Sequence, residues 1–349
     1  MPAPRQAAGP LRIVAIGGGT GLSTLLKGLK RYVPAFDSGR GWLSPAVQIT
    51  AVVTATDDGG SSGRLRREFD ILPPGDIRNC MVALSEDEML LAKLFQHRFS
   101  AGRGLKGHSF GNLFLAALTQ ITGDFPKAVR LSSEVLAIAG DIFPSTAANV
   151  TLKAHLRNGQ TVTGESRISR SESPIELIEL EPPDVKPMAE TLAAIREADV
   201  ITFGPGSLYT SVAPNLLVAG IPQAIQHSPA VKACLVNLMS QPGETTGMSA
   251  ADHVEAVLKH AGRALVDCAV VNTAPVSKAL LARYARTQAM PVFNDLRRIE
   301  ALGVKIVGLP LLAPGTQVRH DSDLLARAVV GLARGGRRRR LLGQAKTAR

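Results

Sequence analysis

The sequence predicts an α/β protein with a doubly wound, mostly parallel sheet. Two observations lead to this prediction. Apolar, β-rich runs alternate along the chain with leucines and alanines at helical spacing, and glycine-rich polar loops follow several of those runs. The first unit shows both: a run at 11–16 leads into the loop 17–21 (GGGTG) and then into leucines at helical spacing from Leu22 to Leu29. Strand, glycine loop and helix in this order are typical of a Rossmann-like fold.

The same pattern continues to residue 333, with one change of period. Around Asn158-Gly159 two short segments alternate as in a β-hairpin, so we expect a small β-rich insertion at about 141–185. Further strands are expected at 49–54, 199–203, 232–238, 265–272 and 304–307. Helices are expected at 64–69, 77–84, 87–98, 113–121, 125–139, 188–196, 250–260, 277–284 and 321–332.

Composition indicates a cytoplasmic globular protein. Of the 349 residues, 45% are hydrophobic and 20% are charged, and no apolar run is long enough to span a bilayer. The first ten residues lack the apolar core of a signal peptide and are expected to be disordered. Three widely spaced cysteines suggest neither a disulfide framework nor a zinc site. We expect a single domain over 11–333.

The last segment, 334–349 (RGGRRRRLLGQAKTAR), is a basic tail. It carries seven of the eleven net positive charges of the chain. A disordered, solvating end is the simpler interpretation, and contact with anionic lipid or nucleic acid is the alternative. Because no aromatic residues are interleaved with the arginines, nucleic-acid binding is disfavoured.

The loop at 17–21 is a candidate phosphate site. It matches neither the dinucleotide fingerprint, which would need glycine at Leu22, nor the P-loop, because no Gly-Lys-Ser/Thr follows. Glycines between a strand and a helix still present backbone N–H groups to an anion. We therefore expect Gly18, Gly19, Thr20 and Gly21 to contact a nucleotide phosphate; a tight turn without a ligand is the alternative.

The loop TDDGGSSG at 56–63 follows the next expected strand and carries two adjacent carboxylates. Neighbouring residues in an extended loop point in opposite directions, so we expect one of Asp57 and Asp58 to face the site and the other to brace the loop. The site carboxylate would accept a ligand hydroxyl or bind Mg²⁺, for which Asp58 is the candidate ligand. A solvated acidic turn is the plain alternative.

Polar residues near two expected helix starts are further candidates. Asp76 is expected to cap the helix from Ile77, and Arg78 to pair either with a phosphate or with Asp76. His108 is either a general acid/base or a structural hydrogen-bond partner. Asn112 is either a helix cap or a contact to a base or ribose.

A third loop with site chemistry follows the strand expected at 199–203. Pro205 stiffens this loop, and hydroxyls at four of the five positions from 207 to 211 exceed what a turn needs. We expect it to bind the ligand through Gly206, Ser207, Leu208, Tyr209, Thr210 and Ser211. A fourth polar loop, 241–246, follows Asn237, which is a further candidate. Such loops share one edge in a parallel sheet, which is where these folds bind ligands.

These loops together resemble the gluconeogenesis-factor family of bacteria, which is related to 2-phospho-L-lactate transferase. The matching stretches are IGGGTGLSTLLKGLK, TATDDGGSSGRLRREFDILPPGDIRNCMVALS, LFQHRF, GHSFGNLFLAALTQITGDF, GPGSLYTSVAPNLLVAGI, NLMSQPGETTGMSAADHV and VRHDSDLL. Thr56, the loop at 34–46 and the arginine-rich tail depart from the family pattern.

The resemblance implies a cytoplasmic protein that is needed for growth and cell shape on gluconeogenic carbon sources. It also implies binding of a UDP-sugar such as UDP-N-acetylglucosamine rather than an established reaction, with Tyr284 and Arg319 among the ligand contacts. Tyr284 would stack on the uracil or the sugar, and Arg319 would clamp the diphosphate. A homodimer and protein partners in cell-wall synthesis are expected with it.

Two enzymatic functions compete with the binding function. A transferase of phospho or nucleotidyl groups would hold Mg²⁺ through Asp57 or Asp58, and it is the stronger alternative. A nicotinamide oxidoreductase is disfavoured, because the fingerprint is broken and the acid at about the right spacing, Asp37, falls in a loop.

Overall fold

The computed structural model describes residues 9–34, 44–85, 90–262 and 265–347, with backbone only from 343 onward. A seven-stranded sheet runs through the molecule in the order β10-β9-β8-β7-β1-β2-β3, and each neighbouring pair is parallel. Its strands are β1 (Leu11–Gly17), β2 (Val47–Val53), β3 (Asp141–Pro144), β7 (Val200–Phe203), β8 (Val231–Leu235), β9 (Cys268–Asn272) and β10 (Lys305–Leu309). The doubly wound α/β prediction is confirmed.

The strand order reverses at the centre of this sheet. From β1 the chain moves outward through β2 and β3, and it later returns to the other side of β1 as β7 before moving outward through β8 to β10. The register sets Ile16 level with Phe203 and Gly17 level with Val53, so the three central strands end together. The loops that follow β1 and β7 therefore meet at the edge where doubly wound sheets bind ligands.

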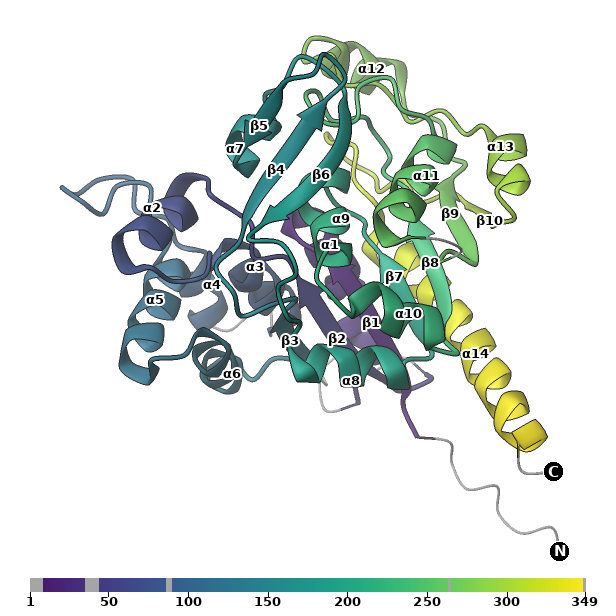
Figure 1. Ribbon diagram of the computed structural model, residues 1–349, viewed down its shortest axis with the longest axis horizontal. Coiled ribbons are helices and arrows are strands. Elements are labelled where there is room, and N and C mark those ends of the chain that lie inside the picture. Colours follow the sequence, from purple (N-terminus) through teal and green to yellow (C-terminus); the bar gives the residue numbers. More distant parts are fainter. Residues whose placement is uncertain (1–8, 35–43, 86–89, 263–264, 348–349) are drawn as a thin grey trace, which may run out of the picture.

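Helices cover both faces of the sheet (Figure 1). On one face α1 (Gly19–Leu29), α3 (Gly75–Leu84) and α14 (Ser322–Thr347) share a hydrophobic core with β1 and β2. The other helices are α2 (Gly60–Phe69), α4 (Leu90–Gln96), α5 (Phe110–Thr122), α6 (Phe125–Val135), α7 (Glu165–Ile168), α8 (Ala189–Glu197), α9 (Ala213–Leu216), α10 (Ile221–His227), α11 (Ala250–Ala261), α12 (Lys278–Ala285) and α13 (Leu296–Ala301), with a 3-10 turn at Lys30–Tyr32 and a π-helical turn, η2, at Leu208–Val212.

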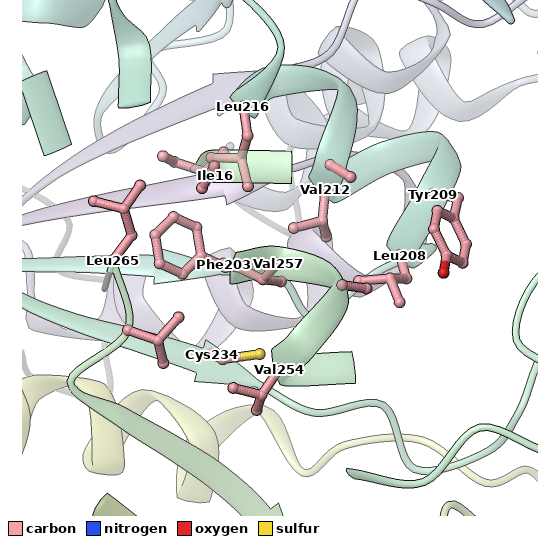
Figure 2. Packing of buried hydrophobic residues seen from close by; sticks show 14 of the residues in the cluster. Ile16, Phe203, Leu208, Tyr209, Val212, Leu216, Cys234, Val254, Val257 and Leu265 are labelled. Carbon is pink, nitrogen blue, oxygen red and sulfur yellow. The ribbon is translucent and has the colours of Figure 1, made fainter. Parts of the chain in front are cut away.

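The opposite face holds a second core around Phe203 of β7. Figure 2 shows this ring among side chains that include Ile16, Val212, Leu216 and Leu265, which come from segments far apart in the sequence. Phe203 and Ile16 are almost fully buried. All four residues of β7 are buried, and three of them are apolar, as expected for a central parallel strand.

A small antiparallel sheet packs against this second core. It consists of β4 (Thr151–Leu156), β5 (Thr161–Thr163) and β6 (Ile175–Glu181) in the order β5-β4-β6. The hairpin predicted around Asn158-Gly159 is present. The predicted insertion boundary of 141 is wrong, because β3 at 141–144 pairs in parallel with β2 and belongs to the main sheet.

Residues 334–347 of the tail are helical, whereas the sequence predicts a disordered tail. The helix α14 continues to Thr347 instead of ending near Leu332. The fully buried carboxylate of Asp199 pairs with Arg337 at 2.6 Å and with Arg340 at 2.9 Å. A Cβ atom on Gly336 would collide with the backbone oxygen of Asp199, so α14 lies directly against the start of β7. Two arginines of the tail therefore have a structural role.

The predictions for residues 1–8 and 348–349 concern residues outside the described part of the chain. Within the part of the chain that the structure covers, no helix combines the length and apolarity that a membrane crossing needs.

Candidate functional site

The candidate site lies where the loops after β1 and β7 press against each other. A Cβ atom on Gly21 would come within 2.5 Å of the Pro205 carbonyl oxygen and 2.7 Å of the Gly206 Cα atom. A Cβ atom on Gly18 would collide with Asp76 Oδ2. These glycines therefore allow α1, the β7 loop and the start of α3 to approach more closely than side chains would permit.

A cavity of about 700 Å³ opens over this junction. It is lined by nine of the residues predicted from the sequence: Gly18, Gly19, Thr20, Gly21, Arg78, Gly206, Ser207, Asn237 and Arg319. They come from five separate segments of the chain, so the predicted convergence of the loops at one edge is present. A cavity of this size is in the range of small-molecule sites.

Cationic side chains surround this first cavity. Lys27, Arg78 and Arg319 line it, and the carboxylate of Asp321 is engaged through Oδ1 by the backbone amides of Asp323 and Leu324 at the start of α14. The Nη2 atom of Arg78 donates to Asn79 at 2.5 Å, whereas its buried Nε atom has no partner within the described residues. The excess of cations and the backbone N–H groups of the glycine loop favour an anionic ligand.

Asp76 lies beneath the glycine loop. It does not cap α3 as predicted, because the helix begins at Gly75 with Pro74 in the capping position. Its carboxyl instead accepts hydrogen bonds from the Gly19 backbone and from Asn79. Burial, followed by the charge of Asp57, raises the pKa of Asp76 to about 6. With this pKa, Asp76 is mostly ionised at pH 7 and becomes protonated only in mildly acidic solution.

The two aspartates of the loop at 56–63 stand outside the first cavity. Asp57 Oδ1 accepts from the Gly59 amide at 2.9 Å, and Asp58 Oδ1 accepts from the Ser166 amide at 2.8 Å. Asp58 thus braces its loop against α7 of the small sheet, but Asp57 does not line the first cavity either, so the prediction that one of the two faces this site is wrong. No cluster of three or more metal-binding side chains occurs in the described ranges, so Mg²⁺ binding by Asp58 stays a prediction.

The loop after β7 divides its residues between the site and the core. Ser207 lines the first cavity and accepts a hydrogen bond from Gln241 Nε2 at 2.7 Å. Leu208 and Tyr209 begin the turn η2 and point into the hydrophobic core (Figure 2), where the Tyr209 ring packs edge-on against His260. Ser211 is also buried, beneath Gly18. The sequence prediction identified the loop correctly but not which side chains face the cavity.

Asn237 fixes the position of that loop. Its Nδ2 atom donates to the Gly206 carbonyl at 2.8 Å, and the Gly206 amide donates to its Oδ1 atom at 3.3 Å. This reciprocal pair joins the end of β8 to the end of β7, so Asn237 both lines the first cavity and shapes it.

Asn112 and His108 lie away from the first cavity. Asn112 is buried in α5, and the cap of that helix is Ser109, whose hydroxyl accepts from the Asn112 amide. The cap alternative for Asn112 is therefore wrong, and its Oδ1 atom has no partner in the described part of the chain. His108 Nδ1 lies 2.9 Å from Ser61 Oγ, and burial lowers the His108 pKa, as fits a structural hydrogen bond.

A second cavity of about 490 Å³ adjoins the first. Four residues line both: Ser207, Met239, Gln241 and Val318. The predicted residues Thr210 and Tyr284 face this second cavity, and the Tyr284 hydroxyl accepts from the Val318 amide at 3.1 Å. Tyr284 and Arg319 thus line two neighbouring cavities and not the same one.

Sequence reasoning missed several residues that line these cavities. Lys27 and His320 line the first, and Glu165 and Glu244 line the second. Glu244 lies in the polar loop 241–246, which the sequence did single out. No comparable signal marks Glu165, because it lies in the short helix α7 of the small sheet, outside the polar loops that follow the strands of the main sheet in the sequence.

Comparison with known proteins identifies the family of this chain. A family described as 2-phospho-L-lactate transferase CofD matches residues 13–312. A protein named gluconeogenesis factor from Halalkalibacterium halodurans is 47% identical over 91% of this chain and 95% of its own length. The chain belongs to the gluconeogenesis factor family. The gluconeogenesis factor of Bacillus subtilis is 45% identical over 92% of this chain and 98% of its own length.

A solved member of the UPF0052 family from Bacillus halodurans has the same fold as this gluconeogenesis factor family protein. Its crystal structure superimposes with a TM-score of 0.85 at 47% identity, and the match covers 92% of this chain and 99% of that one. The transferase match ends at residue 312, whereas the wall of the first cavity continues through 318–322 with Arg319 and Asp321. That wall therefore lies beyond the segment shared with the transferase family.

Proposed function

We propose that this protein binds a UDP-sugar of the UDP-N-acetylglucosamine type and acts as a regulatory protein required for growth and cell shape on gluconeogenic carbon sources. The observation that carries the proposal is the first cavity, where a glycine loop at a helix N-terminus meets Lys27, Arg78 and Arg319. A diphosphate is the ligand group that such a set of amides and cations suits best. The name gluconeogenesis factor, which the relatives share, supports the link to gluconeogenic growth.

Titration calorimetry with UDP-N-acetylglucosamine, UDP, GDP and NADH tests the binding function. Arg319→Gln should weaken UDP binding about 10- to 100-fold, because a hydrogen bond to a charged group contributes about 1.5–3 kcal/mol and 1.4 kcal/mol is tenfold in affinity. Arg286→Gln is the matched control, since Arg286 is exposed and lines neither cavity. If only NADH binds, or if both variants behave alike, the proposal is wrong.

A phospho- or nucleotidyl-transferase is the second candidate function. The match to the 2-phospho-L-lactate transferase family over 13–312 favours it. In that case Asp57 or Asp58 would hold Mg²⁺ and the glycine loop would neutralise the phosphate. Mg²⁺-dependent turnover of a bound nucleotide with a second substrate would support this function, and tight binding without turnover would support the regulatory one.

The expected homodimer is tested separately, by measuring the molar mass in solution with light scattering, with and without ligand.

A further inference from the structure

The two adjoining cavities carry opposite chemistry. Lys27, Arg78 and Arg319 line the first, whereas the second is lined by the carboxyls of Glu165 and Glu244. In the part of the chain that is described, no lysine, arginine or histidine lines the second cavity. A ligand that extends from one cavity into the other would pass from a cationic to an acidic surrounding.

Glu244 is the more buried of the two carboxyls, with 6% of its surface exposed. Its Oε1 atom accepts hydrogen bonds from Thr210 at 3.1 Å and from Ser169 at 3.2 Å, while Oε2 makes no hydrogen bond of ordinary geometry in the described structure. Burial raises the pKa of Glu244, and the two hydroxyls, together with the amides at the start of η2, oppose that rise.

Glu165 faces the same space from the small sheet. Its Oε2 atom accepts a weak hydrogen bond from Thr56 at 3.4 Å. Burial raises the pKa of Glu165 well above its ordinary value, and the charges of Asp57, Asp76 and Glu244 add to this rise. In either protonation state, each carboxyl can accept a hydrogen bond from a ligand hydroxyl.

The rest of the second cavity combines hydroxyls with an apolar wall. Ser240 and Thr287 add hydroxyl groups, and Ala289 and Val318 lie beside the Tyr284 ring. The hydrogen bond from the Val318 amide to the Tyr284 hydroxyl holds that ring in place. A fixed aromatic ring with several neutral hydrogen-bonding groups suits a hydroxyl-rich ring such as a hexose.

We propose that the second cavity is a subsite for an uncharged, hydroxyl-rich group attached to the diphosphate, and that it rejects an anionic group. The inference rests on the proposed function, because the diphosphate must be anchored in the first cavity. A carboxylate in the second cavity would lose its water beside Glu165 and Glu244 without a cationic partner. An unpaired buried charge and like charges in contact are both strongly unfavourable.

Calorimetry with UDP, UDP-glucose and UDP-glucuronate tests the inference on the unmodified protein. The two sugar nucleotides differ only at C6 of the hexose, which is a hydroxymethyl group in one and a carboxylate in the other. UDP-glucose should bind at least about tenfold more tightly than UDP-glucuronate, because juxtaposed like charges cost several kcal/mol at an interface. UDP-glucuronate should bind no more tightly than UDP.

A variant that adds a cation to the second cavity should reverse this preference. Thr287 is exposed and lines the second cavity, so Thr287→Arg should fold and should raise the affinity for UDP-glucuronate relative to UDP-glucose by about tenfold. UDP itself should bind unchanged. The control Gln223→Arg adds the same charge on exposed α10, outside both cavities, and should leave the preference unchanged.

The outcomes separate the two proposals. If UDP binds but UDP-glucose and UDP-glucuronate bind equally, or if Thr287→Arg changes nothing, the subsite is refuted and the nucleotide function stands. If none of the three ligands binds the unmodified protein, the proposed function is refuted and the subsite falls with it.

Discussion

Replacing Arg337 with methionine should destabilise the protein, because α14 is docked through this residue. Arg337 bonds Asp199 through both Nε and Nη2, and its Nη1 donates to the Gly9 carbonyl at 3.0 Å. Asp199 is completely buried, and it keeps a contact with Arg340 and the Arg12 amide in the variant. Removing one partner of a buried ion pair lowers the free energy of unfolding by about 3–5 kcal/mol. Because Asp199 keeps its other partners, we expect a loss of about 2–3 kcal/mol here.

Urea unfolding measures this loss, with Arg338→Met as the matched control. Arg338 is the next residue along α14 and is exposed, so its replacement should change the free energy of unfolding by no more than about 0.5 kcal/mol. The result that would refute the reasoning is equal stability of the two variants. In that case the tail would be a solvated segment, as its composition suggests, and the contact with Asp199 would contribute nothing to the fold.

Three further predictions concern the site. Gly21→Ala should lower the free energy of unfolding, measured in urea, by about 1–3 kcal/mol, because the added Cβ atom would meet the Pro205 oxygen at 2.5 Å. The control is Gly331→Ala in α14, which has open space around it and should be neutral or stabilising. Equal effects of the two substitutions would contradict the close approach of the loops. Asp76 holds its proton to about pH 6 when folded and releases it near its ordinary pKa of 3.8 when unfolded. Its contribution should therefore lower the free energy of unfolding by about 3 kcal/mol in all as the pH rises from about 3 to 7, with most of the loss between pH 4 and 6. Unfolding measured across this range should show a flatter profile for Asp76→Asn, and an unchanged profile would show that the Asp76 pKa is not raised. Asp58→Ala should lower the free energy of unfolding by about 1–3 kcal/mol even with EDTA present, because it removes the acceptor of the Ser166 amide. A loss of stability seen only when Mg²⁺ is supplied would contradict the bracing role.

The parts of the fold that sequence predicts well are those set by local pattern. Apolar runs followed by glycine loops located the strands β1, β2, β7 and β8, and Asn158-Gly159 located the hairpin of the small sheet. The sequence predicts no strand at 141–144 and places these residues in the insertion, because four residues carry too little pattern to reveal that their partner is β2. The docking of α14 was missed for a related reason: the partner of Arg337 lies 138 positions away in the sequence.

In the site, sequence predicts which loops converge better than which side chains face the cavity. Ser207 and Tyr209 belong to the same hydroxyl-rich loop, yet one lines the first cavity and the other is packed on His260. The π-helical turn at 208–212 decides this, and nothing in the pattern of the residues indicates such a turn. Glu165 escaped notice because a glutamate on a short helix ordinarily faces solvent.

The distribution of charge between the two cavities bears on which candidate function is the better one. Phosphoryl transfer proceeds mainly through positioning and through cations that neutralise the transferred group. The cationic side chains of the site, Lys27, Arg78 and Arg319, line only the first cavity. A phosphorylated second substrate that entered the second cavity would instead meet Glu165 and Glu244. A single ligand with its diphosphate in the first cavity and a neutral sugar in the second uses both environments, and this favours binding of a nucleotide sugar over transfer between two phosphorylated substrates.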